Sequence, residues 1–321
     1  MASSKPPRAS APIEGVFVAS VTPRRAQENS IDLGATLELI DFLGETGIAG
    51  IALLGSTGEF VHFALDDRRH MVNFAAKRSR VSLLVNVSYS TLDGAVELAR
   101  EAAGAGVAGV LLMPPHYFRY SQDEVRSFYL AYASAIGEII PTYLYNIPVF
   151  TTEIGSSLAG ELLAGGYFKG IKDSSGSLEY FQTLLRQAAG TPCTLFAGVE
   201  RIYIPSRRAG AHGTISGVGS ALPELMLALD HAVLAGDEPG VQQFEARLTE
   251  FLGWTDQFPW PAAVKEALQI RKLNAGALAA PLSETKQRKL SDFAAWFRGW
   301  LPDLLRECRA ALDPKGVTKR G

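Results

Sequence analysis

The chain has little of several residue types and patterns that mark particular classes of protein. Only two of its 321 residues are cysteine, so neither a disulfide framework nor a cysteine metal motif is indicated. No uncharged apolar run is long enough to span a bilayer. Neither sign of charge dominates, because 31 Lys and Arg residues stand against 33 Asp and Glu residues. The sequence therefore lacks the basic surface expected of a nucleic-acid-binding protein or of a polybasic membrane anchor.

The composition is otherwise typical of a globular enzyme, with 47% hydrophobic and 20% charged residues. Residues 1–12 are rich in Ser, Pro and Ala and lack the apolar core of a signal peptide, so we predict a disordered arm there. Residues 313–321 are predicted to form a frayed tail. These features favour a cytoplasmic protein, and we expect neither a nucleic-acid partner nor a membrane partner.

Short apolar runs recur through the interior and alternate with stretches of helical spacing. Continuous apolar runs indicate parallel strands that are buried on both faces. Eight strand–helix units predict an α/β fold, a (β/α)₈ TIM barrel over residues 13–236, with a helical C-terminal extension over residues 237–312. A doubly wound sheet is the alternative, but no nucleotide-binding fingerprint supports it. The predicted strands span residues 16–21, 50–54, 82–87, 109–113, 141–145, 168–172, 193–197 and 212–216.

The boundaries of several predicted helices carry local signals. Asp32, Ser90, Ser121 and Ser177 each precede a helical pattern, where their side chains can accept hydrogen bonds from free backbone N–H groups. A glycine-rich segment at residues 104–106 is typical of a helix exit. These signals support the alternation of strands and helices.

If the barrel is correct, function lies at the C-terminal ends of its strands. Lys172 ends one apolar run and is followed by an aspartate, two serines and a glycine. A buried amine loses its proton more readily than an amine in water, and the neutral amine can condense with a ketone to form a Schiff base. The alternative is a strand-end lysine whose amine extends to solvent.

Two other predicted strand ends carry groups that suit this chemistry. Segment 55–59, Gly-Ser-Thr-Gly-Glu, offers backbone N–H groups and hydroxyls that could hold a carboxylate, although a polar capping loop would look similar. Tyr145 could relay a proton, because a phenol both donates and accepts, although it could also be a rim tyrosine. Together with Lys172, these groups predict Schiff-base chemistry on a 2-oxo acid.

The same strand ends lack the residues of other catalytic sites. They carry no lysine-bearing phosphate loop and no pair of histidines placed to hold a catalytic metal. We therefore predict no metal site and expect the histidines to be structural or solvated. The five histidines are His62, His70, His116, His212 and His231.

These motifs, in this order and spacing, resemble the dihydrodipicolinate synthase / N-acetylneuraminate lyase family of class I, pyruvate-type aldolases. The likeness runs from about residue 13 to the C-terminal helices. Segment 55–59 is similar to the family's pyruvate-carboxylate loop, segment 145–148 to its catalytic-tyrosine motif and segment 170–174 to its Schiff-base motif. Segment 213–216 is similar to the eighth strand, and segment 257–265 to the family's C-terminal segment.

The resemblance implies a role for each of these residues. Lys172 would form the imine with pyruvate or another 2-oxo acid, and Tyr145 would move the proton with help from the hydroxyl of Thr57. Ser56 and Thr57 would hold the carboxylate. Tyr117 would cross a tight dimer interface, which implies a homo-oligomer, a dimer of dimers. No metal or organic cofactor would be needed. The other substrate-binding candidates are Ser174, Gly198 and the carbonyl of Ile215.

Some positions depart from the family's pattern. Phe150 stands where dihydrodipicolinate synthases carry an arginine that binds the carboxylate of aspartate semialdehyde, and a phenyl ring cannot replace a bidentate cation. Glu200 is followed by Arg201, where an acidic pair is expected in neuraminate lyases. Glu200 could bind sugar hydroxyls and Arg201 a distal carboxylate, or both could be solvated charges. The expected effector positions hold Phe60, Val61, Ser90 and Gly94, which disfavours feedback by lysine.

The sequence thus predicts a lyase that acts on pyruvate or a hydroxylated 2-oxo acid by retro-aldol cleavage or dehydration. A 2-keto-3-deoxy sugar acid is one candidate substrate. One alternative is a 4-hydroxy-tetrahydrodipicolinate synthase with an atypical site for its second substrate. Others are a metal-dependent class II aldolase and a non-catalytic paralogue that binds 2-oxo acids.

Overall fold

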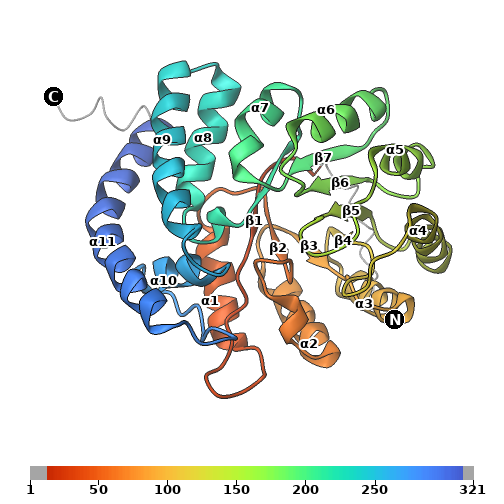
Figure 1. The fold of residues 1–321 in the computed structure, drawn as a ribbon, viewed down its shortest axis with the longest axis horizontal. Coiled ribbons are helices and arrows are strands. Elements are labelled where there is room, and N and C mark those ends of the chain that lie inside the picture. The colour runs from red at the N-terminus through yellow and green to blue at the C-terminus, as the bar shows by residue number, and fades with distance from the viewer. Residues whose placement is uncertain (1–12, 314–321) are drawn as a thin grey trace, which may run out of the picture.

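The computed structural model describes residues 13–313, and the predicted arm at 1–12 and most of the predicted tail, 314–321, lie outside this range. Its centre is a closed barrel of parallel strands in the order β1 to β8. The predicted TIM barrel is confirmed, with strand ends displaced by one or two residues (Figure 1). The strands are β1 Gly15–Ala19, β2 Gly50–Leu53, β3 Ser82–Asn86, β4 Gly109–Leu112, β5 Thr142–Asn146, β6 Gly170–Asp173, β7 Thr194–Ala197 and β8 Gly213–Ser216.

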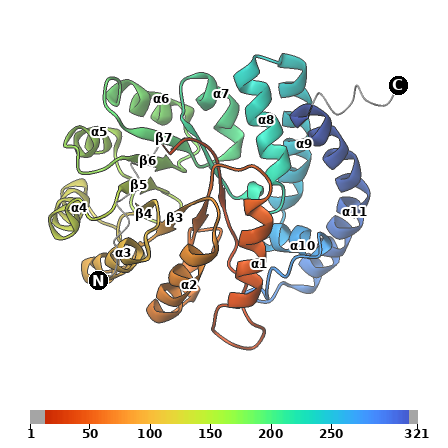
Figure 2. The same ribbon diagram turned by 180° about the vertical axis from the view of Figure 1, so that it is seen from behind.

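Helices surround the barrel as an outer layer, which Figure 2 shows from behind. Short 3₁₀ helices follow β2, β7 and β8, at the C-terminal ends of these strands. The α-helices that follow the strands are α1 Leu33–Gly44, α2 Leu65–Arg78, α3 Leu92–Ala105, α4 Gln122–Ile136, α5 Ser156–Ala164, α6 Leu178–Gln187, α7 Tyr203–Arg208 and α8 Pro223–Ala235. The 3₁₀ helices are η1 Phe60–His62, η2 Glu200–Ile202 and η3 Val218–Ser220.

The caps explain where these helices begin. Asp32 and Ser177 accept backbone hydrogen bonds at the starts of α1 and α6, and Ser121 forms a capping box with Glu124 at the start of α4. The prediction for α3 was wrong by one residue, because the hydroxyl of Thr91, not that of Ser90, accepts from the Gly94 N–H.

The strands are buried because helices cover their outer face and side chains fill the barrel. Every residue of β2, β4, β5, β6, β7 and β8 is buried. This burial on both faces accounts for the continuous apolar runs of the sequence. It also means that a polar residue inside these strands must have a partner or a function.

Three helices follow the barrel: α9 Glu238–Thr255, α10 Ala262–Ile270 and α11 Glu284–Leu312. They lie at one side of the barrel, where α9 and α11 pack against α8 and α10 packs against α11 (Figure 1). Aromatic side chains fill the space between α9 and α11, with ring centroids 4.8–6.3 Å apart. These side chains are Phe251, Trp254, Phe258, Phe293, Trp296, Phe297 and Trp300.

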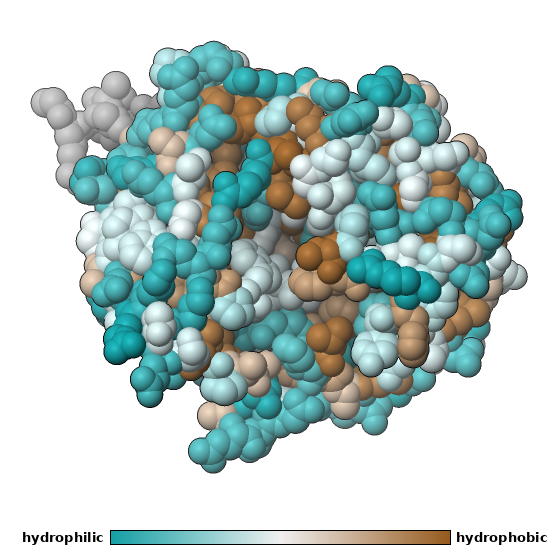
Figure 3. All heavy atoms as spheres, in the orientation of Figure 1, coloured by the Kyte–Doolittle hydropathy of each residue, from teal (hydrophilic) through white to brown (hydrophobic). Residues whose placement is uncertain are grey.

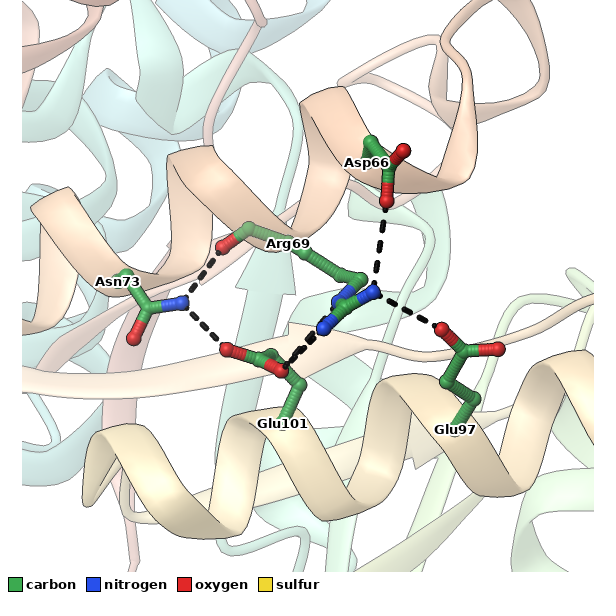
Figure 4. A network of polar contacts seen from close by, with 5 residues as sticks. All are labelled: Asp66, Arg69, Asn73, Glu97 and Glu101. Carbon is green, nitrogen blue, oxygen red and sulfur yellow. Dashed lines mark hydrogen bonds and ion pairs between the residues drawn. The ribbon is translucent and has the colours of Figure 1, made fainter.

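Polar contacts join neighbouring helices on the outside. Arg69 of α2 lies 3.0 Å from Glu97 and 3.1 Å from Glu101 of α3, and 3.4 Å from Asp66 of its own helix (Figure 4). Asn73 donates to Glu101 at 2.6 Å. Hydrophilic residues cover much of the face seen in Figure 3, and hydrophobic residues lie toward its centre. None of the helices within residues 13–313 is long and apolar enough to cross a membrane.

Candidate active site

The register between β5 and β6 brings a tyrosine and a lysine together near the C-terminal ends of the barrel strands. Tyr145 and Lys172 are directly paired across the two strands, so their side chains point to the same face of the sheet. Tyr145 is fully buried and Lys172 is 3% exposed. The lysine Nζ lies 3.4 Å from the tyrosine Oη and 4.4 Å from the centroid of its ring. Lys172 therefore does not extend to solvent.

A hydroxyl from the far side of the barrel completes this group. The Oγ of Ser56, on the loop after β2, lies 3.0 Å from the Oη of Tyr145. The order Lys172, Tyr145, Ser56 is a chain of hydrogen-bonding groups along which a proton can move. We had expected the hydroxyl of Thr57 to assist Tyr145, and the structure instead places the Ser56 hydroxyl there.

Thr57 has a different partner. Its Oγ1 accepts a hydrogen bond from the indole Nε1 of Trp260 at 3.2 Å, and the residue is buried. Gly217 makes this contact possible, because a Cβ at that position would lie 2.8 Å from the Thr57 Oγ1. Trp260 is a site residue whose role the sequence did not reveal.

An ion pair holds the same loop from the other side. Glu59 has a left-handed backbone, with φ of 50°, and its carboxylate pairs with the ammonium of Lys265 from α10. The two side chains are 10% and 3% exposed, and Lys265 also donates to the carbonyl of Ala277 at 3.2 Å. The ion pair therefore connects the loop after β2 to the C-terminal helices. Sequence analysis missed this pair, since 206 residues separate its members.

A glycine gives Lys172 the room that it needs. A Cβ at Gly198, at the end of β7, would lie 2.9 Å from the Cε of Lys172. The neighbouring Ser174 directs its hydroxyl to the Gly198 carbonyl at 3.4 Å. Ile215 is fully buried in β8. These three predicted residues therefore lie in or next to the strands that surround the lysine.

A buried carboxyl group lies on the residue after the lysine. Asp173 accepts hydrogen bonds from Asn146 at 2.8 Å and from the Ser175 hydroxyl at 2.8 Å. Asn146 in turn accepts from the N–H of Ile154 at 3.0 Å, which connects the end of β5 to its loop. Burial raises the pKa of Asp173 to about 6, although its hydrogen bonds oppose the shift. This network holds β5 and β6 in the register that pairs Tyr145 with Lys172.

The predicted residues for the second substrate lie farther out. Phe150 is 57% exposed on the loop after β5. Glu200 accepts from the Ser216 hydroxyl at 2.6 Å and from the Val218 N–H at 3.1 Å. Arg201 forms an ion pair with Asp256. The two charged residues thus already have partners within the chain.

The loop after β4 is also exposed. Tyr117 is 85% exposed, has φ of 84°, and its ring centroid lies 4.9 Å from that of Phe118. Within this chain it does not reach the Lys172–Tyr145 pair. The guanidinium of Arg119 donates to the carbonyl of Thr151, which connects this loop to the one that carries Phe150.

The region of the expected effector positions contains a buried cation. The Phe60 ring lies 4.9 Å from the guanidinium carbon of Arg68 and 5.5 Å from the His116 ring. Burial lowers the pKa of Arg68 to about 10, and burial also lowers the pKa of His116. Val61 is exposed, and the Ser90 hydroxyl lies 3.0 Å from the Nε2 of His116. Among residues 13–313, no group of three or more His, Cys, Asp or Glu residues is placed to hold a metal ion.

Comparison with known proteins agrees with this geometry. The model of the dihydrodipicolinate synthetase family matches residues 12–297. The chain belongs to this family. It is therefore an enzyme of a lyase family that forms or breaks carbon–carbon bonds.

Individual relatives cover most of the chain. The 4-hydroxy-tetrahydrodipicolinate synthase of Sorangium cellulosum is 30% identical over 275 residues, which are 84% of this chain and 90% of the relative. The structure of the synthase from Methylacidiphilum fumariolicum is 25% identical, with a TM-score of 0.83 over 92% of this chain and 99% of that one. The 2-keto-3-deoxygluconate aldolase of Picrophilus torridus shares the fold at 24% identity, with a TM-score of 0.78 over 83% of this chain and 96% of that one.

Proposed function

We propose that this enzyme is a Schiff-base lyase that acts on pyruvate or on a hydroxylated 2-oxo acid. The observation that carries the proposal is the buried pair in which Lys172 Nζ lies 3.4 Å from Tyr145 Oη. A buried amine beside a hydroxyl that can both donate and accept has what imine formation needs: a nucleophile and a proton relay.

In the proposed first step, the neutral amine of Lys172 attacks the C2 carbonyl carbon of the 2-oxo acid. A C–N bond forms, and the carbonyl oxygen takes a proton to give a carbinolamine. Tyr145 supplies that proton and recovers one from the nitrogen, and Ser56 extends the relay through its 3.0 Å contact. Loss of the hydroxyl as water leaves the imine. Ser56, Thr57 and the backbone N–H groups of their loop would hold the substrate carboxylate.

In the second step, the protonated imine accepts the electron pair of the bond that breaks. In retro-aldol cleavage this is the C3–C4 bond, the C4 hydroxyl loses its proton, and an aldehyde leaves. In dehydration a C3 proton leaves first and the C4 hydroxyl departs as water. Hydrolysis then returns the free lysine. All of these steps use groups of the chain and water, so we propose that no metal or organic cofactor takes part.

The surroundings of Phe150 disfavour a carboxylate on the second substrate. Phe150 has no charge, Arg119 donates to the Thr151 carbonyl, and Arg201 is paired with Asp256. A missing charge-assisted hydrogen bond to a carboxylate would cost about 2–3 kcal/mol. A 2-keto-3-deoxy sugar acid is therefore our preferred substrate class.

A second candidate is 4-hydroxy-tetrahydrodipicolinate synthase, because that is the name of the Sorangium cellulosum relative. A coupled assay with pyruvate and aspartate semialdehyde distinguishes the two. Turnover of aspartate semialdehyde well above that of a panel of 2-keto-3-deoxy sugar acids would favour the synthase.

We also propose a homotetramer in the cytoplasm, built as a dimer of dimers. The 85% exposed Tyr117, at φ of 84°, supports an interface at the loop after β4, where a second copy could take up its ring. Sedimentation analysis checks this assembly. A monomer at all concentrations would exclude it.

Borohydride trapping tests the proposed chemistry. Reduction of the enzyme with pyruvate present should leave a stable adduct on Lys172, which peptide mass spectrometry locates. The exposed Lys169, three residues away, and the buried, ion-paired Lys265 are internal controls and should stay unmodified. Lys172→Ala should give no adduct. Failure to trap any 2-oxo acid would contradict the proposal and favour a non-catalytic 2-oxo-acid-binding protein or a class II mechanism, and chelation tests the latter.

A further inference from the structure

A cavity of about 430 Å³ lies beside the catalytic loop and is not needed for the proposed reaction. Four segments line it: the connection between β1 and α1, the segment at η1, and two C-terminal stretches around Trp260 and Leu278. Its size falls within the range of small-molecule sites. Neither Lys172 nor Tyr145 lines it, so it is separate from the proposed imine site.

One side chain connects the cavity with the catalytic loop. Trp260 lines the cavity and donates from its indole N–H to the Oγ1 of Thr57 at 3.2 Å. The tryptophan thus contacts both the cavity and the loop that carries Ser56 and Thr57. A ligand in the cavity would therefore contact Trp260, which in turn contacts Thr57, one of the groups proposed to hold the substrate carboxylate.

The charge of the cavity favours an anion. Arg24 lines it, and the buried Nε of this residue has no hydrogen-bond partner among residues 13–313. Within residues 13–313, no carboxylate lies within 4.0 Å of its guanidinium nitrogens. The carboxylate that does line the cavity, Glu59, is neutralised by Lys265. The neighbouring Arg25, in contrast, lies 3.6 Å from Glu28.

The remaining lining suits a short apolar body. Val61, Leu278 and the ring of Trp260 present hydrocarbon, and Asn29 adds an amide that can donate a hydrogen bond. A guanidinium binds a carboxylate through two parallel hydrogen bonds. We propose that the cavity is a binding site for a small carboxylic acid with an apolar chain, held by Arg24.

Calorimetry with the full chain tests the site, with 3-methylbutanoate as the probe. Binding is measured in the wild type and in Lys172→Ala, which cannot form an imine, and both should bind the acid equally. Arg24→Ala should lower the affinity at least tenfold. Arg25→Ala is the matched control, because it removes the adjacent cation but not the one in the cavity, and its affinity should be unchanged. The uncharged 3-methylbutanamide should bind at least tenfold more weakly.

Several results would overturn the site. They are equal binding of acid and amide, equal losses in the two arginine variants, and no binding at millimolar concentrations. One further experiment distinguishes binding in the cavity from binding at the substrate-carboxylate position. Enzyme whose Lys172 carries the borohydride-reduced pyruvate adduct should bind 3-methylbutanoate as before. Lost binding would place the probe at Lys172 instead. Because Lys172→Ala is one of the two proteins titrated, the test of the cavity does not depend on whether the enzyme forms an imine.

Discussion

The two halves of the active site differ in how their residues are held. In the inner half, Lys172 and Tyr145 are buried at strand ends, and the half-buried Ser56, on the loop after β2, is hydrogen-bonded to Tyr145. The outer half, around Tyr117 and Phe150, lies on exposed loops. Groups at strand ends are fixed by the register of the barrel, whereas groups on loops depend on loop sequence. Under the proposed function, the inner half would therefore determine the chemistry and the outer half would select the second substrate.

The largest expected effect comes from the inner relay. Tyr145→Phe keeps the ring over Lys172 but removes the hydroxyl, and positioned proton transfer contributes about 10²- to 10⁴-fold to a rate. Turnover should fall by that factor while the circular dichroism spectrum and melting temperature stay close to those of the wild type. Tyr143→Phe, two residues away in β5, is the control and should keep most of its turnover. Comparable losses in both variants would mean that the effect comes from packing.

The second effect concerns how firmly the inner half is anchored. Lys265→Met leaves the Glu59 carboxylate buried without its partner, and breaking a buried pair costs about 3–5 kcal/mol. Chemical denaturation should show this loss. The exposed pair of Arg126 and Glu161 is the control, and Arg126→Gln should have no measurable effect. A stable Lys265→Met enzyme would show that the loop holds its shape without this ion pair.

The third effect is a pH dependence that originates next to the lysine. The folded-state pKa of Asp173, about 6, lies above its ordinary value of 3.8, so the folded protein holds this proton more tightly than the unfolded chain. The stabilisation of the folded state by this proton is fully present below about pH 4 and is lost as the pH rises through about 6. The total is about 3 kcal/mol. Glu153 and Tyr180 lie nearby, and repulsion from Glu153 adds to the shift.

The measurement is a comparison of unfolding free energies between about pH 3 and pH 8. Because other carboxylates also titrate in this range, the quantity of interest is the difference between the wild type and Asp173→Asn. That difference should change from about pH 4 to about pH 7, centred between the two pKa values of Asp173, and stay constant above about pH 7. Parallel curves would contradict the assigned pKa.

The smallest effect is expected in the outer half. Phe150→Ala should leave the yield of the borohydride adduct unchanged, because the side chain is exposed and lies outside the Lys172–Tyr145–Ser56 chain. Any change should appear as a KM for the second substrate altered by about tenfold or less. An adduct yield that falls with this variant would remove the distinction between the two halves.

Much of the inner half could be predicted from the sequence. Apolar runs locate the strands, and the position of Lys172 at a strand end follows from where its run stops. The hydroxyl that contacts Tyr145 was harder to predict, because Ser56 and Thr57 are adjacent in the sequence and only the three-dimensional structure shows which of them faces the tyrosine. The contacts of Trp260 with Thr57 and of Lys265 with Glu59 each span more than 200 residues, which no local pattern encodes.

The position of Trp260 has a spectroscopic consequence. The chain has four tryptophans, and the other three, Trp254, Trp296 and Trp300, belong to the aromatic cluster between α9 and α11. Trp260 lies instead against the loop after β2, where its fluorescent indole donates a hydrogen bond to the Oγ1 of Thr57. The emission of the wild type minus that of Trp260→Phe therefore isolates an intrinsic optical probe of the active site, which could follow substrate arrival in real time without any added label.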